Sequence, residues 1–268
     1  MSFSYVAVIL GGMLGLGTGS FLNVVIDRGA RGETLRGRSR CESCNKKLSV
    51  KELLPIFSFL IQKGRCRNCG AALSWQYPLV ELATAVFYAI SVWFFLPSYQ
   101  TGVGLLVSGL GAFLVIATSI VIFVSDLKYE IIPDGAFLIL LAVGLMVSAW
   151  RFYGGSGLVE ISYHIATSIF LSLFLASLWF ISRGQWMGLG DAKLILATSF
   201  MIGFPLSLVS FLFSFWLGGI TGIALILTGQ KTLKNDIPFG PFILIATLLA
   251  YFFGQDFIIF SGLNNLTL

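Results

Sequence analysis

Residues 102–134 read GVGLLVSGLGAFLVIATSIVIFVSDLKYEIIPD, and this stretch decides the class of the protein. Its first part, residues 102–124, carries no charged side chain. About 20 apolar residues are enough to cross a bilayer as a helix. The run ends at Asp126, and an ionisable group at the edge of a membrane span is costly unless it is paired or hydrated. The stretch therefore predicts a transmembrane helix with a candidate functional acid at one end.

The rest of the chain repeats this pattern. The composition is 57% hydrophobic and only 11% charged, with a mean hydropathy of +0.91, which excludes an ordinary soluble domain. Together with Gly102–Val124, seven further apolar segments predict an all-α polytopic membrane protein with about eight transmembrane helices. The sixth of the eight is short and is either a tilted or a partial span. These seven are Tyr5–Ile26, Leu79–Leu96, Gly135–Trp150, His164–Ile181, Ala192–Gly203, Pro205–Thr228 and Pro241–Phe260.

The distribution of basic residues predicts the orientation. Eleven of the 17 Lys and Arg residues lie between Asp27 and Gln76. Because positive residues in short loops stay cytoplasmic, this loop is expected inside and the N-terminus outside. Alternation across eight spans then leaves only Arg151 outside. Asp126 and Asp191 both fall at the inner surface, and the remaining basic residues expected inside are Lys128, Arg183, Lys193, Lys231 and Lys234.

All four cysteines lie in that loop, as Cys41-Glu-Ser-Cys44 and Cys66-Arg-Asn-Cys69. Two C-x-x-C turns can bring four thiolates to one tetrahedral Zn²⁺. A redox pair and two disulfides are the competing interpretations, although a cytoplasmic loop is reducing. A closed four-cysteine site is structural, because no coordination position is left for water. The intervening segment, residues 48–64, is amphipathic, and either lies along the membrane surface or folds over the metal site.

The second candidate acid is Asp191, in MGLGDAKL at 187–194. Gly188 and Gly190 remove side chains just before it, so backbone and substrate can approach the carboxylate closely. They also permit a non-helical entry that places Asp191 in the first turn of the next helix, where the helix dipole favours a negative charge. Lys193 either pairs with an acid or holds a substrate carbonyl.

Asp126 is followed by two further acids, Glu130 and Asp134, before the next span. Asp126 and Asp134 could each begin or cap a helix, and helix capping is the simpler interpretation of Asp134. Two carboxylates in close proximity cannot both ionise easily, so that one keeps a proton while the other acts as a base toward water. Asp126 and Asp191 together predict aspartic-protease chemistry, without a metal or a covalent intermediate.

The first span, residues 5–26, differs from a cleaved signal peptide because it has no basic segment before the apolar run. Gly11, Gly15 and Gly19 recur at i, i+4 and i+8. This spacing places a glycine stripe on one helix face and predicts close packing against another span.

Taken jointly, seven segments of the chain resemble the bacterial type IV prepilin peptidase family, whose members are membrane aspartic proteases and N-methyltransferases. The matching segments run through nearly the whole chain in the family's order. They are the two C-x-x-C pairs, GSFLNVVIDR (19–28), YPLVELATA (77–85), DLKYEIIPD (126–134), GLGDAKL (188–194) and IPFGPF (237–242).

The resemblance implies that Asp126 and Asp191 are the catalytic aspartates. The candidate accessory residues are their sequence neighbours Lys193, Asp134, Gly188 and Gly190. It implies cleavage of the basic class III leader of prepilins or pseudopilins at the cytoplasmic face. The new N-terminal residue is then methylated from S-adenosyl-L-methionine. Residues 1–100, with the zinc loop at 27–77, are expected to form the methyltransferase part and 101–268 the peptidase core. In this resemblance Gly64 and Glu81 are linked to methyl transfer.

Two other functions are compatible with part of the sequence. A proton-coupled transporter could use intramembrane acids, although transporter sites lie near the bilayer midplane. A zinc-anchored assembly protein of a pilus or secretion machine would tolerate loss of both aspartates. The basic loop is expected to contact anionic lipid rather than nucleic acid. His164, the only histidine, is expected at an outer helix start, away from the chemistry.

Overall fold

The computed structural model describes residues 2–95, 102–154, 157–230 and 237–262. Lys231 and Lys234, used above for the orientation, lie outside these ranges. Apart from two isolated β-bridges, the regular structure in the described ranges is helical. The elements are α1 Ser2–Ala30, η1 Val50–Glu52, α2 Phe57–Ile61, α3 Gln76–Phe95, α4 Gly102–Tyr129, α5 Asp134–Tyr153, α6 Leu158–Ser182, α7 Leu189–Ile202, α8 Leu206–Leu227 and α9 Gly240–Phe260.

Seven of these helices are long and apolar enough to span a membrane, namely α1, α3, α4, α5, α6, α8 and α9. The all-α membrane fold is therefore confirmed, and the helices fall where the hydropathy predicted them. The predicted span at 192–203 forms α7, which has 14 residues. At about 1.5 Å per residue it reaches only about 21 Å, so the count of eight spans stays a prediction.

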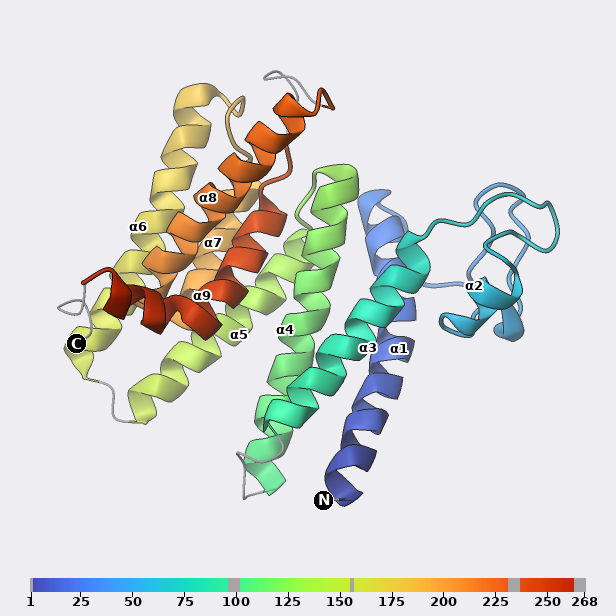
Figure 1. Cartoon of the computed structure of the whole chain (residues 1–268), viewed down its shortest axis with the longest axis horizontal. Helices are drawn as coiled ribbons and strands as arrows, with labels where there is room; N and C mark the ends of the chain where they lie inside the picture. The colour runs from blue at the N-terminus through green and yellow to red at the C-terminus, as the bar shows by residue number, and fades with distance from the viewer. Residues whose placement is uncertain (1, 96–101, 155–156, 231–236, 263–268) are drawn as a thin grey trace. The chain divides into compact units, whose positions relative to one another are not determined.

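The chain divides into two compact units, Met1–Val121 and Ile122–Leu268. In the first unit α1 and α3 lie side by side (Figure 1). The predicted glycine stripe is confirmed, because it faces α3. A Cβ added at Gly15 would lie 2.6 Å from Cα of Ala85, and one added at Gly19 would lie 2.7 Å from Cα of Glu81. These contacts are with backbone, so the two helices pack at a distance that only glycine permits.

Replacing Gly15 with Ala should therefore lower the free energy of unfolding by about 1–3 kcal/mol, the usual cost of overpacking. The measurement is denaturant-induced unfolding of the purified protein in detergent micelles. Gly17→Ala is the matched control on the same helix, because a Cβ there meets nothing within 4 Å. Equal stability of the two variants would contradict the close packing of α1 on α3.

In the second unit α7 packs against α5, α6, α8 and α9 (Figure 1). Most of its side chains are buried, and Leu194 and Ala197 are fully so. Because α7 is enclosed by longer helices, its length need not match the bilayer. This burial explains how a short segment can start with a polar, glycine-rich turn and still stand among membrane helices.

His164 is a correction to the sequence analysis. It does not start a helix, because α6 begins six residues earlier at Leu158, and the side chain is only 4% exposed. Its Nδ1 accepts the backbone N–H of Phe204 at 2.6 Å in the turn between α7 and α8. Arg151 donates to the carbonyl of Met201 at the end of α7. Both side chains satisfy backbone groups that the break between the two helices leaves unpaired.

Candidate active site and cysteine cluster

The two candidate aspartates lie in the same unit and both are buried. Asp126 is in the last turn of α4 and Asp191 is in the first turn of α7, and each is 6% exposed. Both acids adjoin Ile132: its side chain would lie 3.5 Å from a Cβ added at Gly240, the residue that bonds Asp126, and 3.2 Å from one added at Gly190, next to Asp191. The fold therefore places two acids that are 65 positions apart in the sequence in one region of the second unit.

Each carboxylate is held by one backbone N–H from a glycine. Oδ2 of Asp191 accepts the N–H of Gly188, the residue that precedes α7, at 3.1 Å. Oδ2 of Asp126 accepts the N–H of Gly240, the first residue of α9, at 2.9 Å. Both donors belong to helix N-termini, whose free N–H groups and dipole favour negative charge. Among the described residues, the hydrogen bonds that orient the pair therefore come from backbone N–H groups.

The space around the two aspartates depends on the absence of side chains at three glycines, Gly188, Gly190 and Gly240. A Cβ at Gly240 would lie 2.7 Å from Oδ2 of Asp126, and a Cβ at Gly188 would lie 3.4 Å from Oδ2 of Asp191. A Cβ at Gly190 would lie 3.2–3.3 Å from the side chain of Ile132, in the loop between α4 and α5. The sequence analysis singled out Gly188 and Gly190 but not Gly240 as a site residue. The glycine between Pro238 and Pro241 was the available signal.

Lys193 and Asp134 form an ion pair of 2.8 Å between the first turns of α7 and α5. Of the two expectations for Lys193, pairing with an acid is confirmed. Asp134 is the first residue of α5 after Pro133 and makes no side-chain cap, so helix capping was the wrong interpretation of it. Both side chains are substantially exposed, so this ion pair adds little to the stability of the fold. It links the starts of α5 and α7 beside the two aspartates. Glu130 directly follows the last residue of α4 and has φ of 54°.

Replacing Gly240 with Ala should slow any hydrolysis at this pair by about 10–100-fold, because the new Cβ displaces the carboxylate of Asp126 and a misplacement of about 1 Å costs that much. The measurement is the single-turnover cleavage rate on a prepilin substrate. Gly219→Ala, in α8, is the control because its Cβ would meet nothing within 4 Å. An unchanged rate in Gly240→Ala would mean that the N–H of Gly240 does not position Asp126.

The four cysteines form a cluster in the first unit. The Sγ atoms of Cys41, Cys44, Cys66 and Cys69 all lie within 4.8 Å of one another, and all four thiols are free. The sulfurs of Cys41 and Cys69 are 3.9 Å apart. A tetrahedral zinc ion with Zn–S bonds of about 2.3 Å places its sulfurs about 3.8 Å apart. The cluster can therefore hold a metal ion, as predicted, and no disulfide joins the four thiols in this structure.

The two C-x-x-C turns have the same backbone construction. In each, the N–H of the first cysteine bonds a carbonyl across the turn, from Cys41 to Lys46 and from Cys66 to Ala71. A residue with positive φ follows each second cysteine, Asn45 in one turn and Gly70 in the other. Backbone N–H groups of Cys69 and then Asn68 lower the pKa of the Cys66 thiol to about 6, which favours the thiolate that a metal requires.

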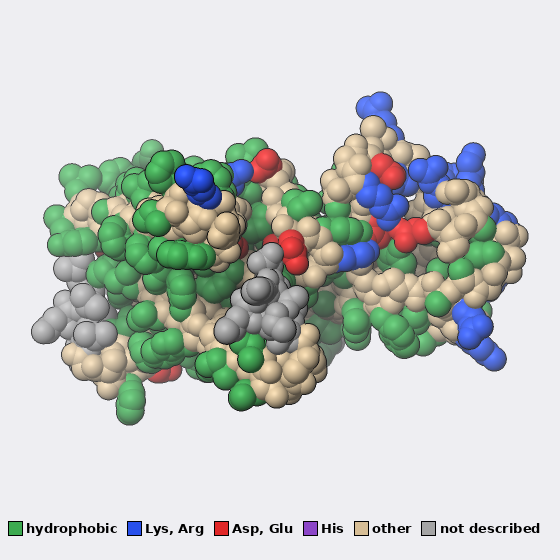
Figure 2. Space-filling model, turned by 90° about the horizontal axis from the view of Figure 1, so that it is seen from above, with side chains coloured by type: hydrophobic (Ala, Val, Ile, Leu, Met, Phe, Trp, Pro, Cys, Tyr) green, Lys and Arg blue, Asp and Glu red, His purple; other side chains and the backbone are tan. Residues whose placement is uncertain are grey.

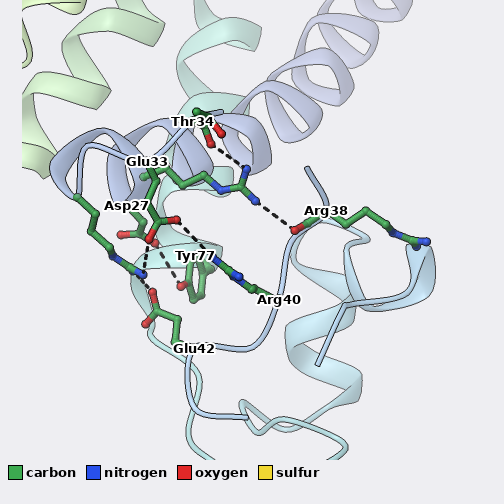
Figure 3. Close-up of polar contacts among 9 residues, drawn as sticks. Asp27, Glu33, Thr34, Arg38, Arg40, Glu42 and Tyr77 are labelled. Atoms are coloured by element: carbon green, nitrogen blue, oxygen red, sulfur yellow. Dashed lines mark hydrogen bonds and ion pairs between the residues drawn. The ribbon is translucent and has the colours of Figure 1, made fainter. Parts of the chain in front are cut away.

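The cysteine loop is tied to α1 and α3 by the polar network of Figure 3. Asp27, near the end of α1, is 6% exposed and accepts the hydroxyl of Tyr77 at 3.2 Å and the amide of Gln76 at 3.3 Å. Arg31 pairs with Glu42, which lies between the first two cysteines. Arg28 donates to three loop carbonyls, those of Thr34, Arg36 and Arg38. Two of the loop's basic residues, Arg28 and Arg31, therefore hold the loop in its conformation.

Two family models match different parts of the chain. Residues 13–95 match the family described as Bacterial Peptidase A24 N-terminal domain, and residues 113–223 match the Type IV leader peptidase family. The chain belongs to the type IV leader peptidase family. A protein of Bacillus subtilis (strain 168), named prepilin leader peptidase/N-methyltransferase, is 34% identical over 229 residues, which cover 83% of this chain and 84% of the relative.

Relatives with the same name from other bacteria agree in extent. The protein of Aeromonas salmonicida (strain A449) is 33% identical over 219 residues, covering 82% of this chain and 72% of the relative. That of Stutzerimonas stutzeri is 29% identical over 271 residues, covering 91% and 90%. No solved structure matches. Because the similarity extends over most of the chain, it supports a protein of this family rather than a transporter or a non-enzymatic assembly protein.

Proposed function

We propose that this protein is a membrane aspartic endopeptidase that cleaves the leader peptide of type IV prepilins or pseudopilins and then N-methylates the new N-terminal residue. The observation that carries the proposal is the buried pair Asp126 and Asp191, held by glycine N–H groups in a chain of this family. The names of the relatives, which state both activities, support the same conclusion.

The pair performs hydrolysis by sharing one proton. The ionised carboxylate removes a proton from water, whose oxygen attacks the carbonyl carbon of the scissile bond. The protonated carboxylic acid gives its proton to the leaving nitrogen as the C–N bond breaks. The products are a leader with a new carboxyl group and a pilin with a free amine. Gly240 and Gly188 keep the two carboxylates in place, and Lys193 with Asp134 holds the helix starts beside them.

The substrate is a class III leader, in which a short basic segment precedes an apolar helix and the scissile bond follows a glycine. The apolar helix of the prepilin remains in the bilayer while the leader reaches the aspartates at the cytoplasmic membrane face. This topology has eight spans, with α7 as a partial one, and places the N-terminus outside. The protein is then a multi-pass protein of the bacterial cytoplasmic (inner) membrane, serving type IV pilus or type II secretion.

Zn²⁺ is the metal that suits the cluster of Cys41, Cys44, Cys66 and Cys69, because four thiolates around a closed site select it. When bound it supplies structural cross-linking and no catalytic water. We assign residues 1–100, with the zinc loop at 27–77, to methylation and 101–268 to cleavage. S-adenosyl-L-methionine is the methyl donor that this activity requires.

The contacts of the two residues linked to methyl transfer do not define a pocket for this donor. Gly64 has φ of 66° and lies against Phe59, where an added Cβ would approach the ring to 3.2 Å. The carboxylate of Glu81 is occupied by the N–H of Ile56 at 2.7 Å. Their role in methylation stays a proposal that rests on the family resemblance.

Mass spectrometry of a prepilin incubated with the purified protein and S-adenosyl-L-methionine tests the function. We expect loss of the leader and gain of one methyl group on the new N-terminus. Cleavage without methylation would retain the aspartate mechanism and remove the assignment of residues 1–100. The Bacillus subtilis relative serves as a control on the same substrate. If it cleaves and this protein does not, the peptidase proposal is wrong for that substrate class.

A further inference from the structure

The loop of the first unit contains an apolar segment that projects from the metal cluster. Residues 53–61 read LLPIFSFLI, with Ser58 as the only polar side chain and no charge. Phe59 is buried, but its apolar neighbours are not: Phe57 is 62% exposed, Leu60 61% and Ile61 66%. A folded loop in water would not leave such large apolar side chains uncovered next to one another. Something apolar therefore covers this segment, which we call the apolar tip.

The position of the apolar tip along α3 is fixed by a hydrogen bond. The backbone N–H of Ile56 donates to Oε2 of Glu81 at 2.7 Å. Glu81 is five residues after Gln76, the first residue of α3, and α3 is one of the candidate membrane spans. At about 1.5 Å per residue, Glu81 lies about 7–8 Å below the start of the helix. Interfacial segments bury their apolar faces about 5–10 Å into the headgroup and acyl boundary, which is the depth of Ile56 when α3 enters the bilayer at its first residue.

The backbone at Ile56 forms an irregular turn whose polar groups are paired, as expected in an apolar environment. Ile56 has φ of 61° and ψ of −52°, and the N–H of Phe57 bonds the carbonyl of Pro55 at 2.6 Å, which makes a γ-turn. A β-branched residue with positive φ is strained and persists only where its surroundings hold it. In an apolar environment the N–H of Ile56 would be costly without a partner. Glu81 supplies that partner, although a carboxylate is rare inside a span.

The residues around the apolar tip suit an anionic lipid surface. Trp75, immediately before α3, is 67% exposed and packs against Phe59 in a tilted arrangement, with ring centroids 4.9 Å apart. Tryptophan at this position marks the membrane interface. Lys51 precedes the tip, and Lys63 and Arg65 follow it, all of them exposed. Figure 2 shows further Lys and Arg side chains gathered on the loop of this unit.

We propose that the apolar tip is a lipid anchor, inserted into the leaflet on the loop side of the bilayer, and that Glu81 is the positioning residue that sets its depth. The bilayer covers Phe57, Leu60 and Ile61, while the adjoining basic residues contact lipid phosphates. The anchor holds the cysteine cluster against the membrane surface beside α3. This assignment is independent of the reaction that the protein catalyses, and it decides between the two placements that the sequence left open for residues 48–64.

Photocrosslinking of the full-length protein in nanodiscs of phosphatidylcholine and phosphatidylglycerol tests the proposal. p-Benzoylphenylalanine is placed at Phe57 or Leu60, at Leu82 as a position exposed on the α3 span, and at Lys47 as a position exposed on the metal turn. After irradiation, mass spectrometry should find lipid adducts at positions 57, 60 and 82 but only background at 47. Adducts at 82 with none at 57 and 60, or crosslinks from these two to protein, would overturn the lipid anchor.

The role of Glu81 is tested in the same assay. Glu81→Ala removes the acceptor for the N–H of Ile56 and should lower the adduct yield at position 57 several-fold. Glu81→Gln keeps an acceptor oxygen at the same place and should restore the yield. Gel filtration in detergent establishes that both variants are folded. An unchanged yield in a folded Glu81→Ala variant would overturn the positioning role. A low yield in both folded variants would overturn it as well, because the amide oxygen should be able to replace the carboxylate.

Discussion

Replacing either Asp126 or Asp191 with Asn should abolish leader cleavage. We expect the cleavage rate to fall by at least about 10³-fold in each single variant, within the range that a general acid or base contributes. Asn has the same shape as Asp and keeps an oxygen that accepts the N–H of Gly240 or Gly188. The loss is therefore one of proton transfer and not of folding. The double variant should be no slower than either single one, because the two groups act as a unit.

Single-turnover cleavage of a prepilin, followed by mass spectrometry, measures this effect. Asp256→Asn is the matched control, since Asp256 is an exposed acid of α9 outside the pair. It should cleave at the wild-type rate. Cleavage that survives in either Asp126→Asn or Asp191→Asn would contradict the shared-proton mechanism. A large further loss in the double variant would indicate that each aspartate acts separately.

The second largest expected effect is that of removing the metal, which should affect N-methylation and not leader cleavage. Cys66→Ser should abolish metal binding, because a structural four-thiolate zinc site contributes about 10 kcal/mol or more in apparent binding free energy and does not tolerate a missing ligand. N-methylation should be lost with the metal, since the C-x-x-C turns order the loop. Cleavage should continue, because Asp126 and Asp191 belong to the second compact unit.

Elemental analysis of the purified protein gives the metal content, and the mass of the processed pilin gives methylation. Ser43→Ala is the control, because Ser43 lies between Cys41 and Cys44 and is not one of the clustered thiols. It should keep both the metal and the methyl transfer. Metal retained by Cys66→Ser would contradict the four-thiolate site. Methylation by metal-free protein would contradict the dependence on the ordered loop.

The pair of Asp126 and Asp191 shows which features of the site a local sequence pattern predicts and which depend on long-range packing. Asp126 and Asp191 are recognisable in the sequence because each interrupts the apolar pattern next to a span. Their orientation is not recognisable, since the donor to Asp126 is Gly240, 114 positions away. A backbone N–H carries no side-chain signal, so only the flanking prolines hinted at it. The same limitation applies to the contact between Glu81 and Ile56.

By itself, the sequence determined the membrane class, the positions of the helices, the cysteine cluster and the two candidate acids. These follow from local properties: the length of apolar runs, the spacing of thiols and the cost of an ionisable group near lipid. Only the tertiary structure decided that α7 is an enclosed helix, that His164 is buried under a turn and that Asp134 pairs with Lys193. These features depend on which helices pack together. The hydropathy pattern does not specify the neighbours of a helix, because each membrane helix has apolar side chains on all of its faces.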